Sequence, residues 1–329
     1  MNKQMSMSFF TDELAQAMTD KRGFLEQMDR LIPWGKWVAM IEPHYYKGER
    51  GNKPYPLERM LRIYILQNLY DLADMAASYE VIDSRAFARF CEVTSSNQVP
   101  DGDTIGRFRH ILTDNNLQEK IFADLKASLE KEGLILKKGT IVDSTLIATS
   151  SSTKNKEKKR DEEAHQVKKG QNWHFGYKAH IGVDKDSGLA HHVVVTAANV
   201  HDVTVTPKLL NGTETEVYGD SGYLGAEKRS EAKTTNEAGE TIQYRINRRP
   251  SSIRKLPEEE QAKARQEEHE KSSVRAKVEH QFAIIKRLFG HRKTRYKGLA
   301  NQIGAVYMQF TLSNLLKAHW RRKRLICCA

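Results

Sequence analysis

The sequence of 329 residues contains few cysteines and no long apolar segment. Its three cysteines (Cys91, Cys327 and Cys328) provide neither a disulfide framework nor the CxxC spacing of a zinc site. No stretch approaches the ~20 apolar residues that a membrane span requires. The first residues also lack the apolar core of a signal peptide. These absences predict a cytoplasmic protein with reduced thiols, no structural zinc and no membrane association.

Several common catalytic motifs are absent as well. The chain has no GxxxxGK[ST] phosphate-binding loop, no GxGxxG after a predicted strand and no GxSxG nucleophile elbow. Its twelve histidines show no HExxH or other zinc-binding spacing. The sequence therefore gives no support to a nucleotide-dependent enzyme, a serine hydrolase or a zinc enzyme.

Acidic residues are scarce at the C-terminal end of the chain. Residues 274–329 contain thirteen Lys or Arg and a single acid, Glu279, whereas the whole chain has 53 basic and 42 acidic residues and a net charge of +11. The positive excess is therefore concentrated in one segment. Such a segment suggests a polyanionic partner, most simply nucleic acid, and an anionic membrane fits the sequence less well.

The segment around Glu279 has the pattern of a helix with one polar stripe. At 100° per residue, Arg275 and Lys286 lie within about 40° of Glu279 around the helix axis. A metal-binding carboxylate flanked by phosphate-binding cations would have this arrangement. An ordinary ion pair between residues i and i+4 would have it too.

The first part of the chain is predicted to be helical from about residue 56 to residue 133. Pro56 suits a first helical turn, Asn116 begins a later helix and Gly133 ends it. Several short helices could form a helix-turn-helix-like DNA-binding unit, or only an all-helical packing or dimerisation domain. The expected N-caps are Asp71, Asp83 and Asp103, and the exposed candidates for DNA contact are Thr104, Arg107, Arg109 and His110.

After Gly139 the apolar period changes from 3.6 to 2, which predicts strands. Residues 173–183 alternate with Trp173 on the apolar face, while Lys178 and His180 lie on the other face, where they could reach DNA or be solvated. Asp202 is expected to cap a helix. The predicted strands are 140–147, 173–183, 189–198, 217–220 and 241–247, and the predicted helices begin near 202, 225, 274 and 299. This order predicts a mixed sheet flanked by helices, as in a ribonuclease-H-like α/β fold.

Three carboxylates occupy places that can converge in such a fold. Asp143 lies among apolar residues of the first strand, Asp220 ends the fourth, and Glu279 lies on a late helix. A buried carboxylate is costly unless it is paired or binds a metal ion. Phosphodiester chemistry with two divalent ions needs hard oxygen ligands that meet at one point. For Asp220, a turn-forming role is an equally good explanation.

Five segments together resemble the DDE transposases of bacterial insertion sequences, most closely the IS-five family. The similarity extends over about residues 30–318 and includes the N-terminal run Lys53-Pro-Tyr-Pro-Leu-Glu-Arg-Met-Leu-Arg-Ile. The five segments occur in order: Gly139-Thr-Ile-Val-Asp143-Ser-Thr, His174-Phe-Gly-Tyr-Lys178-Ala-His-Ile-Gly-Val-Asp184, Thr196-Ala-Ala-Asn-Val-His-Asp202, Gly219-Asp220-Ser-Gly-Tyr-Leu-Gly225 and Arg275-Ala-Lys-Val-Glu279-His-Gln-Phe-Ala-Ile-Ile-Lys286.

This resemblance implies a catalytic and metal-binding triad of Asp143, Asp220 and Glu279. For two Mg²⁺ ions, with Mn²⁺ as a substitute, two-metal chemistry suggests that Asp143 bridges both ions, Asp220 ligates one and Glu279 the other. Arg275 and Lys286 match a Tyr-x2-Arg-x3-Glu-x6-Lys helix motif whose Tyr position is Ser272 here. The contribution of that Tyr to binding DNA ends therefore cannot be transferred.

The resemblance also implies a DNA transposase located with the bacterial nucleoid. Such an enzyme binds the terminal inverted repeats of its element, cleaves at the ends and joins the 3′-hydroxyls to target DNA, at least as a dimer and without a nucleotide cofactor. The rival interpretations are a non-catalytic, domesticated DNA-binding protein and a structure-selective nuclease of the same fold. The proposed DNA-contacting residues are Arg275, Lys286, Lys178, His180, Arg107, Arg109, Arg292, Lys293, Arg295 and Lys297.

The expected domain organisation has three parts. A helical N-terminal domain for DNA binding or dimerisation covers residues 1–135, and a ribonuclease-H-like DDE domain covers 136–318. Charged insertions are expected in the second domain at about 149–171 and 249–272. A basic tail at 319–329 contains Arg321-Arg-Lys-Arg324 and is expected to add non-specific affinity for DNA.

Overall fold

A computed structural model describes residues 17–48, 53–154 and 158–327. The first sixteen residues, which carried the expectation about a signal peptide, and Cys328 lie outside the described residues. The chain forms two compact units, which are described separately. Unit 1 comprises Met1–Gln67 and Leu72–Ile111, and unit 2 comprises Asn68–Asp71 and Leu112–Ala329.

Unit 1 is helical, as the apolar periodicity predicts. Its most buried helix, α4, begins directly after Pro56, and every residue of unit 1 in it from Met60 to Gln67 is buried. Most of these residues are apolar, so the helix provides the centre of the core of this unit. The helices are α2 (Asp20–Leu31), α3 (Trp34–Ile41), α4 (Leu57–Tyr70), α5 (Asp74–Asp83), α6 (Arg85–Phe90) and α7 (Gly102–Asp114).

The three aspartates expected to cap helices do not do so. Asp71 follows α4 with a φ of 52°, Asp83 is the last residue of α5, and Asp103 lies inside α7. A capping side chain must accept a hydrogen bond from the first turn. Ser84 accepts one from the Phe87 N–H and Asp101 from the Thr104 N–H. The predictions for Asp83 and Asp103 failed because a neighbouring polar residue provides the cap, and the helix after Asp71 has no side-chain cap.

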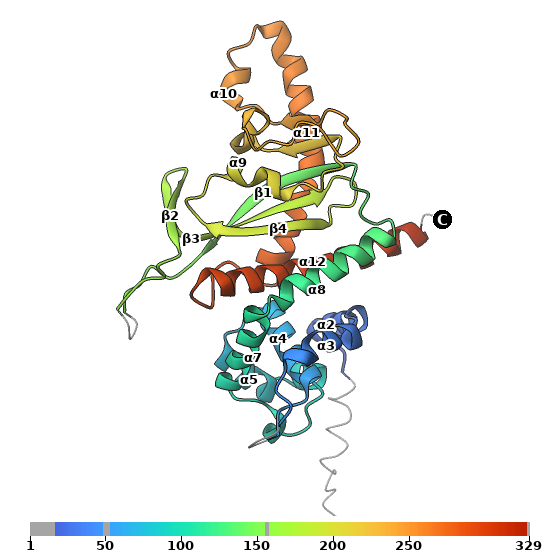
Figure 1. Ribbon diagram of the computed structural model, residues 1–329, viewed down its shortest axis with the longest axis vertical. Helices are drawn as coiled ribbons and strands as arrows, with labels where there is room; N and C mark the ends of the chain where they lie inside the picture. The colour runs from blue at the N-terminus through green and yellow to red at the C-terminus, as the bar shows by residue number, and fades with distance from the viewer. Residues whose placement is uncertain (1–16, 49–52, 155–157, 328–329) are drawn as a thin grey trace, which may run out of the picture. The chain divides into compact units, whose positions relative to one another are not determined.

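Unit 2 contains a six-stranded mixed sheet (Figure 1). β1 is central, antiparallel to β3 and parallel to β5, which in turn is parallel to β6; β2 and β4 both pair with β3. This arrangement, with helices on the sheet, confirms the predicted mixed α/β class. The strands are β1 (Gly139–Ala148), β2 (His165–Lys169), β3 (Asn172–Asp184), β4 (Ala190–Ala197), β5 (Glu216–Gly219) and β6 (Gln243–Ile246).

Two long helices pack against this sheet (Figure 1). α11 contacts β1 and β5, and α12 contacts β4 and α8. The charged stretch before Glu279 is not separate from the Glu279 helix, because α11 runs through both. The helix expected from Gly225 is only a three-residue 3₁₀ turn. The helices of unit 2 are α8 (Leu117–Lys131), α9 (Asp202–Val205), α10 (Pro250–Ile253), α11 (Glu258–Ala283), continued by a π-helical turn to Leu288, and α12 (Leu299–Cys327).

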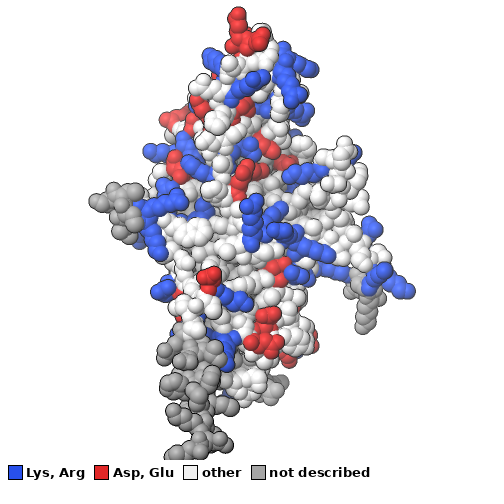
Figure 2. Space-filling view, turned by 180° about the vertical axis from the view of Figure 1, so that it is seen from behind, with Lys and Arg blue, Asp and Glu red and all other residues white. Residues whose placement is uncertain are grey.

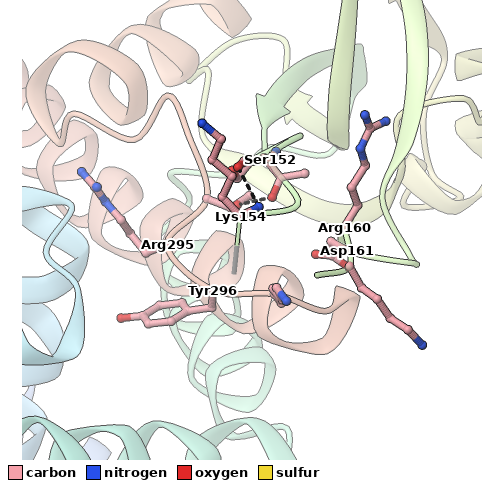
Figure 3. Close-up of a pocket in the computed structure, with 11 residues that line it drawn as sticks. Ser152, Lys154, Arg160, Asp161, Arg295 and Tyr296 are labelled. Atoms are coloured by element: carbon pink, nitrogen blue, oxygen red, sulfur yellow. Dashed lines mark hydrogen bonds between the residues drawn. The ribbon is translucent and has the colours of Figure 1, made fainter. Parts of the chain in front are cut away.

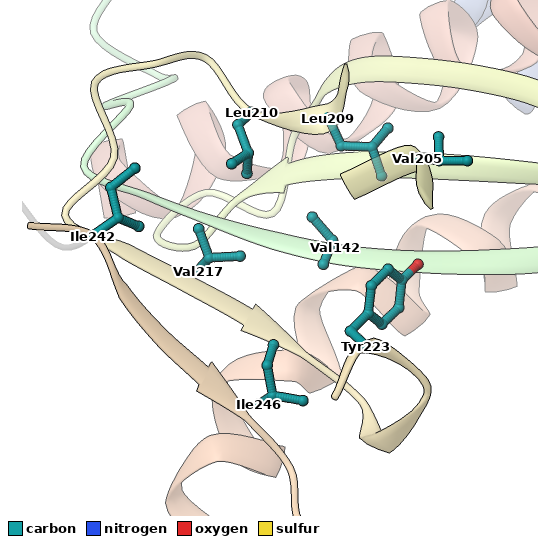
Figure 4. Close-up of a cluster of buried hydrophobic side chains, with 8 residues drawn as sticks. All are labelled: Val142, Val205, Leu209, Leu210, Val217, Tyr223, Ile242 and Ile246. Atoms are coloured by element: carbon teal, nitrogen blue, oxygen red, sulfur yellow. The ribbon is translucent and has the colours of Figure 1, made fainter. Parts of the chain in front are cut away.

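A cluster of buried apolar side chains supports the strands that carry the aspartates (Figure 4). Val142 and Val217 are fully buried in it and precede Asp143 and Asp220 by one and three residues. Ile242, Ile246 and the ring of Tyr223 pack in the same cluster. The close packing of these side chains fixes the backbone on which the two carboxylates stand.

Trp173 does not belong to the core, although the alternating pattern placed it there. Its side chain is 66% exposed. β3 extends past β4 at this end, and residues 172–176 pair only with the short strand β2 and the end of β1. Among the described residues, no helix combines the length and the apolar character that crossing a membrane requires.

Candidate active site

Asp143 stands in the middle of β1, opposite Ile181 of β3. Its side chain is 17% exposed. Burial raises the pKa of Asp143 to about 6, and the nearby carboxylate of Asp220 adds to the rise. The Ser144 N–H, which donates to Asp143 Oδ1 at 2.7 Å, and the Arg275 guanidinium oppose it. A carboxyl group in this setting binds a cation readily once it is ionised.

Asp220 follows β5 on the neighbouring parallel strand. Ile141 pairs with Tyr218, so Asp143 and Asp220 both lie two residues beyond this pair and on the same face of the sheet. The Asp220 Oδ1 also accepts a hydrogen bond of 2.9 Å from the Gly222 N–H. The turn-forming role is therefore real, and it places the carboxylate beside Asp143 rather than excluding a functional role.

Helix α11 brings its basic residues to the same strand. The Arg275 guanidinium lies 3.7 Å from Asp143 Oδ2 and donates to Asn247 Oδ1 at 3.1 Å. Lys286 Nζ, from the π-helical turn, donates to the Leu146 carbonyl at 2.8 Å. Glu279 lies between them on the exposed side of the helix and forms no ion pair with a described residue. The expected alternative, an ion pair between Arg275 and Glu279, is not formed.

The aspartate pair fits a divalent cation. Both side chains offer hard oxygen ligands, and a cation would neutralise two carboxylates that raise each other's free energy in a half-buried place. Within the described part of the chain, no group of three His, Cys, Asp or Glu side chains is close enough to hold a metal ion. The structure thus brings together Asp143 and Asp220, while the exposed Glu279 of α11 does not join them in a metal-binding group.

Asp202 has a place in this site that the sequence did not reveal. It begins α9, and its Oδ1 accepts hydrogen bonds from Ser144 Oγ at 2.9 Å and Lys178 Nζ at 3.1 Å. His180 Nδ1 lies 3.4 Å from the same oxygen. The expected capping role is wrong, because the carboxylate faces the strands. An Asp at the start of a short helix gives the same local sequence whether it caps the helix or bonds to a neighbouring strand, so the sequence does not distinguish the two roles.

Lys178 and His180 are buried beside Asp202, so the alternative that they are simply solvated is wrong. Burial lowers the pKa of His180 to about 4, with Lys178 adding to the shift and Asp202 opposing it. Its Nε2 lies 2.9 Å from Thr196 Oγ1. These side chains hold β3 and α9 together, and a direct DNA contact by either stays a prediction that burial does not favour.

Tyr223 is a second residue that the sequence did not single out. Its ring is buried in the apolar cluster (Figure 4). Its hydroxyl has no hydrogen-bond partner among the described residues. Burial raises the pKa of Tyr223 well above its usual value, and Asp143, Asp202 and Asp220 add to the rise in that order. The negative charges of all three aspartates therefore act on this one buried hydroxyl.

The other proposed DNA contacts divide into exposed and paired residues. Arg107 on α7 is exposed, but Arg109 is buried and donates to Asp74 at 2.9 Å, so its expected exposure is wrong. Arg295 is held by Asp71 at 2.7 Å. Figure 2 shows Lys and Arg side chains spread over the face in view, with acidic side chains among them. Arg292, Lys293 and Lys297 are exposed as well.

Two family models match the chain. The model described as "Transposase DDE domain" matches residues 135–315, and the model described as "Transposase domain (DUF772)" matches residues 12–111. No solved structure matches. The first match implies a ribonuclease-H-like fold for unit 2, and DDE transposase domains generally use divalent metal ions. Neither match indicates the kind of insertion sequence. Because the first match covers more than half of the chain, this protein belongs to the family of transposases with a DDE domain.

Proposed function

We propose that this transposase serves a bacterial insertion sequence of the IS-five family. In this proposal it binds the terminal inverted repeats, hydrolyses the phosphodiester bonds at the element ends and joins the freed 3′-hydroxyls to target DNA. The single observation that carries the proposal is the half-buried pair of Asp143 and Asp220 on adjacent parallel strands, with Arg275 of α11 beside Asp143. Since two ends must be processed together, at least a dimer acts on DNA.

Asp143, Asp220 and Glu279 would hold two Mg²⁺ ions, with Mn²⁺ as a substitute. When bound, the ions supply Lewis-acid activation of the attacking oxygen and stabilisation of the leaving oxygen. Glu279 has an exposed side chain, so it can turn toward the aspartates without breaking an ion pair. No covalent enzyme intermediate and no nucleotide is required.

The surrounding residues position the carboxylates and the DNA. Arg275 keeps a positive charge beside Asp143 and favours its ionised form. Asp202 holds Ser144, the next residue of β1, and thereby limits movement of the strand. Lys286, which contacts the backbone of the same strand, can offer its ammonium group to a phosphate near the aspartates.

A cleavage and joining assay tests this function. It uses purified protein, labelled terminal-repeat DNA, a target plasmid and Mg²⁺ or Mn²⁺. Wild-type protein should cleave and join, whereas Asp143→Asn, Asp220→Asn and Glu279→Gln should bind DNA without either reaction. Asp186→Asn, in the turn between β3 and β4, is the matched control and should remain active.

The same assay separates the rival interpretations. Cleavage without joining would indicate a structure-selective nuclease, and binding without cleavage in the wild type would indicate a domesticated DNA-binding protein. Full activity of any one of the three triad variants would remove that residue from the proposed triad.

A further inference from the structure

A pocket of about 350 Å³ lies where β1 leaves the sheet (Figure 3). Its walls come from the segment after β1 and from the segment that precedes α12. Figure 3 shows Ser152, Lys154 and Arg160 on the first segment and Arg295 and Tyr296 on the second. The lining residues are Thr149, Ser150, Ser152, Lys154, Lys159, Arg160, Asp161, Thr294, Arg295, Tyr296 and Lys297.

The pocket is strongly basic. Five of its lining residues are Lys or Arg, and Asp161 is the one acid among them. Asp161 is buried, and its Oδ2 accepts hydrogen bonds from Tyr177 Oη at 2.7 Å and from the Gly298 N–H at 3.0 Å. The Asp161 carboxylate thus holds the two segments of the pocket together through hydrogen bonds, and it forms no ion pair with the described basic residues of the lining. Lys154 and Arg160 are exposed at the surface of the pocket, among the hydroxyl groups of Ser150 and Ser152.

The second wall is fastened to the strand that carries Asp143. The Thr294 N–H donates to the Ala148 carbonyl at 2.8 Å, and the Ala148 N–H donates to the Arg292 carbonyl at 3.3 Å. Thr294 Oγ1 also donates to Thr149 Oγ1 at 2.9 Å. The pocket therefore keeps a fixed position relative to the catalytic strand.

Cations follow β1 from Asp143 to this pocket. Arg275 lies beside Asp143, Lys286 contacts the Leu146 carbonyl, and the Arg292 guanidinium donates to the Lys286 carbonyl at 3.2 Å. Three cations at the opposite end of β1 are paired with acids, since Lys185 and Arg245 both bind Glu216 and Lys137 binds Glu130 at 2.9 Å. In the pocket, Arg295 is paired with Asp71 and Lys159 with Glu162. Lys154 and Arg160 are exposed and belong to none of these ion pairs, so they are the pocket cations best placed to meet a polyanion.

We propose that this pocket binds a backbone phosphate of duplex DNA that lies along β1 on one side of the cleavage site. The inference rests on the proposed function. From Asp143 to Thr149 the strand advances about 20 Å, at roughly 3.3 Å per residue. Duplex DNA rises about 3.4 Å per base pair, so the pocket would hold a phosphate about six base pairs from the scissile bond. Hydroxyl and ammonium or guanidinium donors together suit a phosphate.

Neutral-phosphate scanning tests this position. A fluorescent terminal-repeat duplex carries one uncharged methylphosphonate at a time, on both sides of the cleavage site, and binding to the full-length protein is followed by anisotropy. The wild type should lose affinity at the cleavage site and again about five to seven base pairs away, on one side only. In Lys154→Ala the second loss should disappear, and the salt slope of binding to the unmodified duplex should fall by about 1.

Two variants separate a phosphate contact from a packing effect. The Arg160 guanidinium lies over the Phe175 ring, 5.9 Å from its centroid, so Arg160→Ala can disturb β3. Arg160→Lys keeps the charge, so its affinity should still fall at the second methylphosphonate position. Lys208→Ala, an exposed cation on the 3₁₀ turn after α9, is the control and should behave as wild type.

The same scan with a target duplex identifies the source of the phosphate. A second loss of affinity in the terminal-repeat duplex assigns the pocket to element DNA. A second loss in the target duplex alone assigns it to target DNA, and either result supports the proposal. The proposal would be overturned if neither scan showed a second loss of affinity, or if that loss were unchanged in Lys154→Ala. Loss of cleavage in Asp143→Asn is measured separately, so the proposed function can stand when this inference fails.

Discussion

The ionisation of Asp143 is the residue-level property on which the site depends. Its pKa of about 6 reflects burial first and the Asp220 carboxylate among the smaller contributions. The folded protein therefore disfavours the charged form that a cation needs, and a bound cation would reverse this preference. The same residue thus contributes to function at the expense of stability in the metal-free protein.

This property predicts a pH-dependent stability difference between wild type and Asp143→Asn. Because the folded-state pKa lies above the usual 3.8, the stabilising contribution of Asp143 is present below pH 4 and is lost as the pH rises through 6. Without divalent ions, Asp143→Asn should therefore gain up to about 3 kcal/mol in unfolding free energy relative to wild type between pH 4 and pH 7. Urea unfolding at several pH values measures it, with Asp186→Asn as control. Parallel profiles for wild type and Asp143→Asn would contradict this explanation.

The Asp202 network gives a second residue-level prediction. Asp202→Asn leaves the buried ammonium group of Lys178 without a charged partner, so the variant should lose about 3 kcal/mol of unfolding free energy. Lys178→Met combined with Asp202→Asn should lose less than the sum of the two single changes. A urea-denaturation double-mutant cycle measures the coupling. Strictly additive losses would show that the two side chains do not depend on each other.

At the scale of elements, five of the six strands followed from the sequence, and so did the long helices apart from the start of α11. The alternation around residues 140–147 and 173–183 matches β1 and β3 because both strands keep one apolar face. β2 escaped prediction because its five residues are mostly polar and exposed, so they carry no apolar period. The start of α11 was missed for a similar reason, since charged residues on all sides leave no stripe to detect.

Asn314 is the residue that joins three of these elements. It lies fully buried on α12, exchanges hydrogen bonds with both backbone groups of Ala190 on β4, and accepts one from Gln281 on α11. Asn314→Ala leaves these groups unsatisfied and should reduce the unfolding free energy by about 2 to 4 kcal/mol. Urea unfolding measures the loss. Asn301→Ala, half-buried near the start of the same helix, should cost less, and equal losses would refute the proposed role of Asn314.

At the scale of the whole molecule, the net charge of +11 predicts DNA binding that weakens steeply with salt. Burial lowers the pKa of Lys286, with Lys169 and Arg292 adding to the effect, so an anion beside it would be stabilising. Lys286→Ala should weaken binding to element ends and reduce the salt slope by about 1. Fluorescence anisotropy at several salt concentrations measures both. An unchanged slope, equal to that of Lys208→Ala, would argue against a phosphate contact.

The sequence predicted the convergence of Asp143 and Asp220, which lie on adjacent parallel strands, better than it predicted their surroundings. Asp143 and Asp220 could be found because each interrupts or ends an apolar strand. The places of Asp202 and Tyr223 could not be predicted, since these residues lie on turns and short helices whose paths depend on tertiary packing. For the same reason Lys178 and His180 were expected to contact DNA or solvent, although both are buried beside Asp202.

The central claim is that Asp143, Asp220 and Glu279 together bind the divalent ions, and a calorimetric titration with Mn²⁺ tests it most directly. Wild-type protein on a terminal-repeat duplex should bind two ions. Asp143→Asn, Asp220→Asn and Glu279→Gln should each bind fewer ions or bind them at least tenfold more weakly, whereas Asp186→Asn should match wild type. Unchanged Mn²⁺ binding in the three triad variants would contradict the account.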